Sequence, residues 1–189
     1  GTTVATNALI EKKGAKMGLI TTEGFKDLME IGWQRRPSLY DLRRPKAESL
    51  IPPGMKQEVT ERILHDGSVL TPLDEDSVRN AVRLLKEMGA QTIAVCTLFS
   101  FLNPVHEDRI KDIIQEEFPG AYVSASHDLV SEFREYSRMS TTMLNAYLGP
   151  VMKEYVHNFE RSVRETGIQV APYVTQSNGS IISIAETVD

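Results

Sequence analysis

A continuous apolar run, "QTIAVCTLFSF" at positions 91–101, constrains the fold of this chain more than any other feature. A strand that is apolar at every position is typical of a strand buried on both faces of a sheet. The residues before it, "DEDSVRNAVRLLKEMG", have the periodicity of an amphipathic helix, with Asp74 as its N-cap and Gly89 after its end. A buried strand next to such a helix predicts an α/β protein.

A second helix and a second strand follow the apolar run. The segment "NPVHEDRIKDIIQEEFPG" has Asn103 at a capping position and Pro104 at the first helical position, where proline is favoured. The next segment, "AYVSASHDL", is predicted to be a strand. Strand, helix and strand at this spacing form a βαβ unit, so we expect the two strands to be parallel, with a right-handed crossover.

Shorter elements are predicted toward the N-terminus. Residues Thr3 to Lys13 have the pattern of a helix closed by Gly14, and "KMGLITT" has the pattern of a buried strand. The stretch Trp33 to Leu70 shows little periodicity, which predicts a long irregular excursion with one hairpin, "KQEVTERILHDGSVLT". Its turn is expected at Asp66-Gly67, a strong hairpin-turn pair.

A long helix is predicted over Ser140 to Thr166, and Pro150 inside it predicts a kink or two abutting helices. The segment "IQVAPYVTQSNGS" then begins another predicted strand. Together these patterns predict an α/β fold, with a parallel-containing mixed sheet and flanking helices. We expect residues 1–166 to form one α/β domain with an excursion at 33–70, and residues 167–189 to begin a truncated second half.

The composition argues against several classes of protein. A net charge of −5 does not suit a general nucleic-acid surface, because neutralising phosphates needs clustered Lys and Arg. The longest apolar stretch, Thr92 to Leu102, is about half the length that a membrane span needs. The single cysteine, Cys96, cannot form an internal disulfide, which fits a reducing compartment. We therefore expect a cytoplasmic protein without a membrane segment.

Two stretches of small polar residues could bind an anion. "GTTVATNA" places Gly1, Thr2 and Thr3 at a helix start, whose free N–H groups suit an anion, although a threonine there can simply cap the helix. "TQSNGS" ends a predicted strand, and backbone amides around Gly179 could approach a phosphate closely. The alternative is an ordinary hairpin turn at Asn178-Gly179.

The histidines give one candidate site. None of the four pairs at metal-ligand spacing, so no metal site is expected. His106 and His157 are expected to be solvated on helix surfaces. His127 and Asp128 lie at the C-terminal end of a predicted parallel strand, and open α/β sheets bind ligands at the carboxyl edge of such strands. These two residues are therefore candidates for a functional site.

A dense group of hydrogen-bonding side chains, "SEFREYSR", precedes the long helix. It contains Glu132, Arg134, Glu135, Tyr136 and Arg138. The charged members could neutralise one another across neighbouring strand and helix ends, because the guanidinium fork suits carboxylates. The helix is predicted to begin at "STT", positions 140–142, with free amides in its first turn. The group is interpreted as a structural clamp, with a polar site as the alternative.

Four long stretches resemble the hydantoinase/oxoprolinase family, A-type subunit, from the first residue nearly to the last. They are "GTTVATNALIEKKGAKMGLITTEGFKDLMEIGWQRRPSLYDL", "LNPVHEDRI", "SHDLVSEFREYSRMSTTMLNAYLGPV" and "TQSNGS". The resemblance implies a fold related to sugar kinases, Hsp70 and actin, in which two ribonuclease-H-like halves close around ATP. It also implies that ATP, with Mg²⁺, phosphorylates a substrate oxygen, and that a cyclic amide such as a hydantoin or 5-oxoproline is then opened by hydrolysis.

The resemblance implies which residues line the nucleotide or substrate cleft. Two sets match the family's motifs near this cleft: Gly1, Thr2, Thr3 and Asn7, and Ser177, Asn178 and Gly179. The family's Arg-Glu-Tyr-x-Arg motif corresponds to residues 134–138, which we expect to be mostly structural. Ser180 stands where the family has a second glycine, which weakens any role that requires glycine there. No catalytic residue can be assigned.

Two nucleotide motifs implied by the resemblance are not in this chain. An Asp-x-Gly-Gly-Thr hairpin would precede Gly1, and a Ser-Gly-Pro-Ala-Gly-Gly motif would follow Asp189. We therefore expect a central fragment that does not hydrolyse ATP alone. A B-type hydantoinase subunit is the expected partner, and a homo-oligomer is also considered. Two alternatives stay open: a fragment of a related ATP-dependent carboxylase subunit, and a non-catalytic assembly module.

Overall fold

The structure of this chain is a computed structural model that describes residues 3–34, 38, 40–41, 43–44, 49–167, 170, 172–175 and 179–183. The chain divides into two compact units. The larger unit is Lys16–Ala146, and the smaller one combines Gly1–Ala15 with Tyr147–Asp189. The predicted βαβ region lies entirely within the larger unit.

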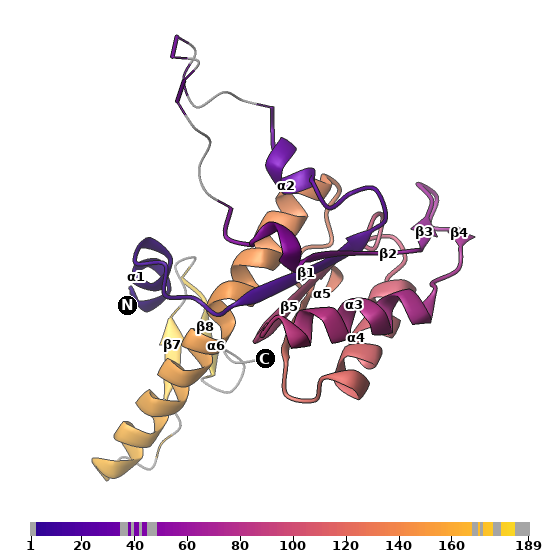
Figure 1. Cartoon of the computed structure of the whole chain (residues 1–189). Coiled ribbons are helices and arrows are strands. Elements are labelled where there is room, and N and C mark those ends of the chain that lie inside the picture. Colours follow the sequence, from indigo (N-terminus) through magenta and orange to yellow (C-terminus); the bar gives the residue numbers. More distant parts are fainter. Residues whose placement is uncertain are drawn as a thin grey trace. The chain divides into compact units, whose positions relative to one another are not determined.

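The core of the larger unit is a four-stranded parallel sheet with strand order β2-β1-β5-β6 (Figure 1). The strands are β1 (Met17–Thr22), β2 (Lys56–Val59), β5 (Thr92–Cys96) and β6 (Tyr122–Ala125). Every residue of β1 and β5 is buried, as expected for central strands covered on both faces. The parallel pairing of β5 with β6 confirms the predicted βαβ unit. The prediction of a mixed sheet is wrong for the described residues, because antiparallel pairs occur there only in two separate two-stranded sheets.

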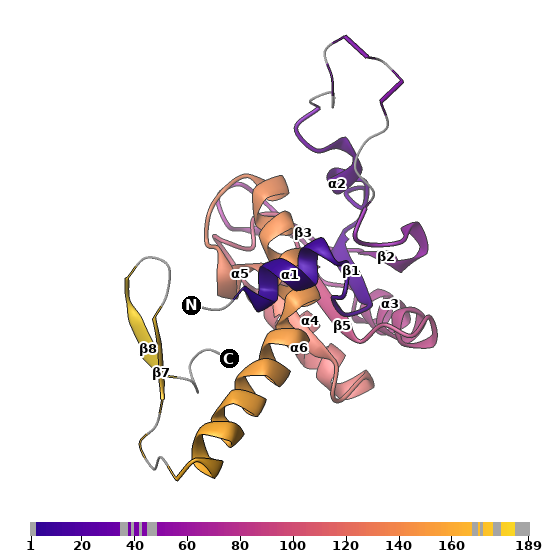
Figure 2. The ribbon, with the colours of Figure 1, turned by 90° about the vertical axis from the view of Figure 1, so that its left-hand side faces the viewer.

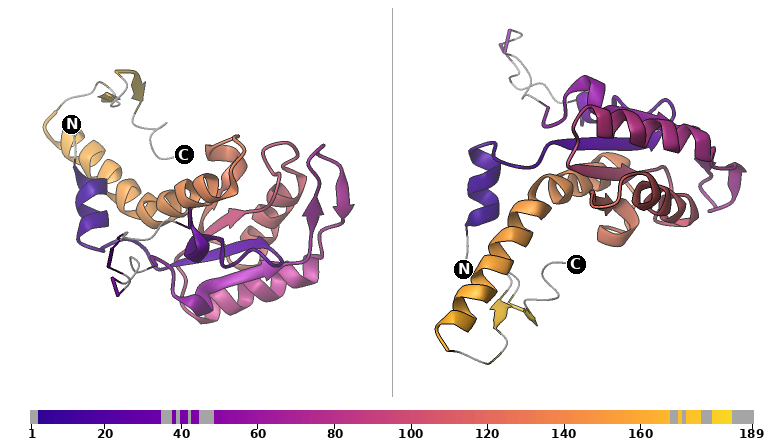
Figure 3. Two further views of the ribbon diagram at one scale, coloured as in Figure 1. Left: turned by 90° about the horizontal axis from the view of Figure 1, so that it is seen from above. Right: turned by 60° about the horizontal axis from the view of Figure 1, so that its bottom comes forward.

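Helices cover both faces of this sheet (Figure 3). Helices α3 (Glu75–Glu87) and α4 (Val105–Glu117) pack against each other on one face. The start of α6 lies on the other face, where Nδ2 of Asn145 lies 3.1 Å from Oγ of Ser124 in β6. A Cβ atom added to Gly18 would lie 2.7 Å from Cδ2 of Leu85, so this glycine allows α3 to approach β1 closely.

The ends of α3 and α4 follow the predicted capping signals closely. The side chain of Asp74 accepts hydrogen bonds from the amides of Asp76 and Ser77, as predicted for an N-cap. Helix α4 begins one residue later than predicted, with Pro104 at the N-cap position. The side chain of Asn103 still accepts a hydrogen bond from the amide of Val105 at 3.2 Å.

The predicted excursion contributes more to the core than its sequence indicates. Strand β2 and the 3₁₀ turn Pro53–Met55 lie inside it, and Ile51, Met55 and Val59 are fully or almost fully buried. Only the two end residues of β2, a short edge strand, are buried. Its sequence, "KQEV", therefore lacks the apolar run by which a buried strand is predicted. The hairpin is formed by β3 (Arg62–Ile63) and β4 (Val69–Thr71) only, with Gly67 at a φ of +82° in the predicted turn.

The smaller unit contains a short helix, a hairpin and most of a long helix. Helix α1 (Val4–Ile10) ends earlier than predicted, and Lys12, rather than Gly14, adopts the left-handed conformation with a φ of +54°. A Cβ atom added to Gly14 would lie 2.2 Å from the ring of Tyr147, so this glycine is needed for packing. The hairpin pairs β7 (Tyr173–Thr175) with β8 (Ile181–Ser183) in antiparallel register (Figure 2).

Helix α6 spans Glu135–Glu165 and passes through Pro150 as one helix. The alternative of two abutting helices is therefore wrong. The helix also begins five residues before the predicted start at Ser140. In the described part of the chain, no helix combines the length and the apolar character needed to cross a membrane.

Candidate functional site

The carboxyl ends of the four parallel strands meet at one edge of the sheet in the larger unit. Strand β2, which follows β1 in the sequence, pairs with one edge of β1, and the later strands β5 and β6 lie on the other side of β1. The direction in which strands are added therefore reverses between β1 and β5. Open α/β sheets bind ligands at such a position. The side chains gathered at this edge are buried and polar; they are Thr22, Glu61, Thr97, Ser100, His106, Glu107, Ser126 and Arg138.

Glu107, in the first turn of α4, is the centre of this group. Its fully buried carboxylate accepts hydrogen bonds from the amide of Thr97 at 2.7 Å and from Oγ of Ser126 at 2.7 Å. It also accepts from the amide of His127 at 3.0 Å and faces the Nδ1 atom of that ring at 2.8 Å. Burial disfavours the ionised form, but hydrogen bonds from His127, Thr97 and Ser126 keep the pKa of Glu107 below its usual value. One carboxylate thus ties the ends of β5 and β6 to α4.

A second buried carboxylate, Glu61, connects β1 to α4. It accepts a hydrogen bond from Oγ1 of Thr22, and its Oε2 atom lies 2.7 Å from Nδ1 of His106. The expectation that His106 is solvated is wrong, since this residue is 6% exposed. His106 and Glu107 are missing from the predicted site residues. Their spacing from Ile110, Ile113 and Ile114, which are buried on α4, is the signal that places them on the inner face.

Arg138 lies at the same edge and is 1% exposed. Its Nη2 atom lies 2.5 Å from the carbonyl oxygen of Thr97, and its Nη1 atom lies 3.4 Å from that of Glu132. Its guanidinium lies over the ring of Phe101. Arg138 therefore joins the end of β5 to the segment that precedes α6.

The predicted mutual neutralisation of the charged group is not found. Among the described residues, no ion pair joins Glu132, Glu135, Arg134 or Arg138, and the buried guanidinium of Arg138 binds backbone carbonyls instead. Arg134 is exposed, beside the ring of Phe133. The other motif residue with a clear contact is Tyr136, whose ring meets Trp33 edge to face at a centroid distance of 5.4 Å. The motif thus comprises Arg134, which precedes α6, and the first turn of that helix.

The predicted free amides at positions 140–142 are not present, because these residues lie inside α6. The hydroxyl of Thr142 donates to the carbonyl of Arg138 at 2.8 Å, one turn earlier in the helix. The helix begins after Arg134, which has a φ of +79°. No Gly or Asn marks that turn, so local sequence signals do not predict it.

The positive φ of Arg134 leads to a test of backbone strain. We expect Arg134→Gly to be about 1 kcal/mol more stable than Arg134→Ala, because a Cβ atom disfavours the left-handed region. Both variants remove the same exposed side chain, so the comparison isolates the backbone. Urea unfolding of the two variants measures the difference, and equal midpoints would contradict the expectation.

His127 and Asp128 lie at the carboxyl edge of the sheet, as predicted, but in the short helix α5 (Ser126–Leu129) that follows β6 and not in the strand itself. The Nε2 atom of His127 lies 3.0 Å from carboxylate oxygens of both Asp108 and Asp128. Asp128 also pairs with Lys111 at 2.6 Å. The hydrogen bond to Glu107 is the largest influence on His127 and raises the pKa of its imidazole. The structure therefore brings His127 together with Glu107.

The remaining predicted cleft residues belong to the smaller unit. Gly1, Thr2, Ser177 and Asn178 lie outside the described residues. Thr3 precedes the seven-residue helix α1, makes no side-chain cap, and lies 3.4 Å from the side chain of Asn7. Gly179, with a φ of +87°, lies between the two strands of the β7–β8 hairpin, which favours the hairpin alternative for that stretch.

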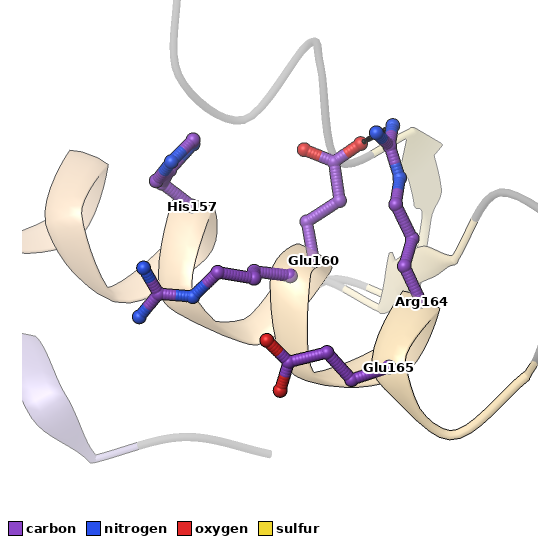
Figure 4. A pocket seen from close by; sticks show the side chains of 5 residues that line it. His157, Glu160, Arg164 and Glu165 are labelled. Atoms are coloured by element: carbon purple, nitrogen blue, oxygen red, sulfur yellow. Dashed lines mark hydrogen bonds and ion pairs between the residues drawn. The ribbon is translucent and has the colours of Figure 1, made fainter.

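Two other features do not form a site. A shallow hollow is lined by side chains of α6 alone, with an ion pair between Glu160 and Arg164 and with His157 exposed as predicted (Figure 4). The thiol of Cys96 is buried, and burial raises its pKa to about 11, so it is neutral at pH 7. No three His, Cys, Asp or Glu side chains among the described residues are grouped to hold a metal ion.

Comparisons with known proteins identify the class to which this open parallel α/β chain belongs. Residues 1–118 match the family model described as "Hydantoinase/oxoprolinase N-terminal region", and residues 138–189 match the one described as "Hydantoinase/oxoprolinase". The chain therefore belongs to the hydantoinase/oxoprolinase family, as its sequence motifs indicated.

Named relatives in this family include a caprolactamase subunit, an acetophenone carboxylase subunit and a 5-oxoprolinase. The chain is 39% identical to caprolactamase subunit alpha of Pseudomonas jessenii, over 96% of this chain and 26% of the relative. It is 35% identical to the acetophenone carboxylase gamma subunit of Aromatoleum aromaticum, over 98% of this chain and 27% of the relative. It is 33% identical to 5-oxoprolinase 1 of Arabidopsis thaliana, over 96% of this chain and 16% of the relative.

Solved structures agree with these relationships. The crystal structure of ATP-dependent caprolactamase from Pseudomonas jessenii matches with a TM-score of 0.90 and 38% identity, over 96% of this chain and 26% of that chain. A nucleotide-free acetone carboxylase matches with a TM-score of 0.83 and 28% identity, over 98% of this chain and 28% of that chain. The chain thus spans about a quarter of the length of the caprolactamase and carboxylase relatives, and 16% of the length of the 5-oxoprolinase.

Proposed function

We propose that the full-length protein is an ATP-dependent hydrolase that opens a cyclic amide such as a lactam, a hydantoin or 5-oxoproline. The observation that carries this proposal is the match to ATP-dependent caprolactamase, with a TM-score of 0.90 over 96% of this chain. The similarity to 5-oxoprolinase 1 supports the same class of substrate. The proposed architecture is the two-halved fold of sugar kinases, Hsp70 and actin, of which the parallel sheet would form a part.

The proposed chemistry explains why a hydrolase would consume ATP. An amide carbon is a poor electrophile. Transfer of the γ-phosphoryl group to the amide oxygen leaves ADP and activates the carbon toward water. Attack by one water molecule and cleavage of the C–N bond then give an acyl phosphate with a free amino end. A second water molecule releases the phosphate and leaves the open-chain acid. Such a transfer needs amides, cations and a metal ion, expected to be Mg²⁺, aimed at the phosphates.

The polar side chains at the carboxyl edge of the larger unit are mostly engaged within the protein. At the carboxyl edge, the buried carboxylates of Glu61 and Glu107 and the Nη atoms of Arg138 bond to neighbouring protein atoms, whereas the buried Nε atom of Arg138 has no hydrogen-bond partner among the described residues. We therefore assign no contact with ATP or Mg²⁺ to them. We propose that this edge is a wall beside the cleft. We also propose a cytoplasmic protein with a B-type partner subunit, a class of partner supported by the subunit names of two relatives.

A test of the proposed function uses the full-length protein with its partner subunit. In the presence of ATP and Mg²⁺, we expect ADP to form only when caprolactam, 5-oxoproline or a hydantoin is added, together with the ring-opened product. The isolated 189-residue chain is the control and should show no ATPase activity above background. ADP release and product formation, followed by chromatography, measure both reactions.

A carboxylase is the second candidate, favoured by the acetophenone carboxylase and acetone carboxylase matches. ADP formation that requires a ketone and bicarbonate, with no response to any cyclic amide, would replace the first proposal with this one. Absence of ADP with every substrate would favour a non-catalytic assembly role.

A further inference from the structure

The imidazole of His127 is enclosed by carboxylates on both of its nitrogens. Its Nδ1 atom lies 2.8 Å from Oε2 of Glu107, and its Nε2 atom lies 3.0 Å from oxygens of Asp108 and Asp128. Glu107 and Asp108 belong to α4, whereas Asp128 belongs to α5. The side chain of His127 is 13% exposed, so water screens these contacts only in part. The ring therefore links α5 to α4.

This geometry suits the protonated ring. A neutral imidazole carries one N–H, so one of its nitrogens would direct a lone pair at a carboxylate. The imidazolium donates hydrogen bonds on both sides. In the described part of the chain, Glu107 pairs with no Lys or Arg, so this imidazolium is its counter-ion there. Removing the proton leaves a buried carboxylate without a compensating charge.

Other charged groups near this pair do not replace the imidazolium. Lys111 of α4 pairs with Asp128, at the outer side of the ring. Cys96 of β5 is buried and neutral, and Arg138 of α6 directs its Nη2 atom to the carbonyl of Thr97. The balance of charge around Glu107 therefore changes when His127 titrates.

The segment that follows His127 depends on this link. The hydroxyl of Ser131 donates to the carbonyl of His127 at 3.2 Å. The connector, residues 130–134, is largely exposed and leads directly into the first turn of α6, where Arg138 reaches the end of β5. The contacts at His127 thus hold the start of a segment with little packing of its own, and Arg138 binds it further along, at the carbonyl of Glu132.

We propose that Glu107 and His127 form a pH-sensitive latch that fastens α5 and the connector to α4, and that releases them as His127 loses its proton. The inference goes beyond the proposed function and does not depend on it. Because the pKa of His127 is raised in the folded state, the stabilisation is complete below about pH 6.5, the usual value for histidine. It is lost as the pH rises through the folded-state pKa.

The test follows the ring and the connector of this chain by NMR. We expect the imidazole of His127 to titrate above about pH 6.5. The amides of Val130 and Ser131 should exchange with solvent more readily at high pH, after correction for intrinsic exchange. Their opening equilibrium should increase about tenfold for each pH unit between the folded-state and unfolded-state pKa values of His127.

Three variants complete the test. His127→Gln should abolish the pH-dependent step, whereas His157→Gln, at an exposed position, should leave it unchanged. Replacing both Asp108 and Asp128 with Asn should lower the pKa of His127 and reduce the step without disturbing a buried group. The proposal is overturned if the ring titrates at or below about pH 6.5. A step that persists in His127→Gln also overturns it.

Discussion

Glu107→Ala should lower the free energy of unfolding of this chain by about 3–5 kcal/mol, the usual cost of breaking a buried ion pair. The substitution removes the acceptor of two backbone amides, a serine hydroxyl and an imidazole, all at the carboxyl edge of the sheet. Water cannot easily replace it, because the residue has no exposed surface. Urea unfolding followed by circular dichroism measures the change.

A glutamate on a neighbouring helix provides the control for this prediction. Glu87 is exposed near the end of α3, so Glu87→Ala should change the free energy of unfolding by no more than about 0.5 kcal/mol. Similar losses of unfolding free energy in Glu107→Ala and Glu87→Ala would show that the hydrogen bonds of Glu107 do not stabilise the carboxyl edge of the sheet. The loss of unfolding free energy in Glu107→Gln should lie between the losses in these two variants. The amide oxygen of Gln can still accept hydrogen bonds, but the NH₂ group of Gln would face other donors.

Arg138→Ala is expected to cost about 3 kcal/mol, the second largest effect. The loss leaves the buried carbonyl of Thr97 without this donor, and an orphaned buried group costs about 1–3 kcal/mol. The substitution also removes the 3.4 Å bond to the carbonyl of Glu132, which is exposed. It also removes packing against the ring of Phe101. Thermal or urea unfolding detects the change, and the m-value shows whether the unfolded state is affected.

Two control variants test this prediction: one changes Arg138 to a different residue, and the other changes an exposed arginine of α6. Arg138→Lys keeps the charge but loses the planar fork, so an intermediate stability is expected. Arg161→Ala, at an exposed position of α6, should be nearly neutral. If Arg138→Ala is as stable as Arg161→Ala, the guanidinium of Arg138 does not hold the end of β5 in place.

The elements with regular patterns were predictable from the sequence. The continuous apolar run marked β5, and its spacing from the following segment predicted the parallel pairing with β6. Asp74 marked the start of α3, because a carboxylate at that position can bind the first free amides. Local patterns such as these are independent of the rest of the fold.

Other elements depend on distant partners and could not be predicted. Strand β2 has a mostly polar sequence because it is a short strand at the edge of the sheet. It forms by pairing with β1, which is distant in the sequence, so local patterns do not predict it. The burial of His106 depends on Glu61, which lies far from it in the sequence. The early start of α6 follows from an arginine in a left-handed conformation, which local propensity disfavours. The family and its chemistry came from motif resemblance, since no spacing of residues identified a catalytic group.

The central position of β1 has a consequence for synthesis of the protein on the ribosome. Met17 lies opposite Thr92, so the inner neighbour of β1 is made long after β1 itself. In a nascent chain that ends before β5, the apolar strand β1 lacks β5 as its partner. Unpaired apolar strands are prone to associate with other chains. Pairing across this sequence separation also slows folding, because a long loop has to close first. Ribosome-associated chaperones that bind exposed apolar segments would therefore have a long interval in which to engage residues 17–22.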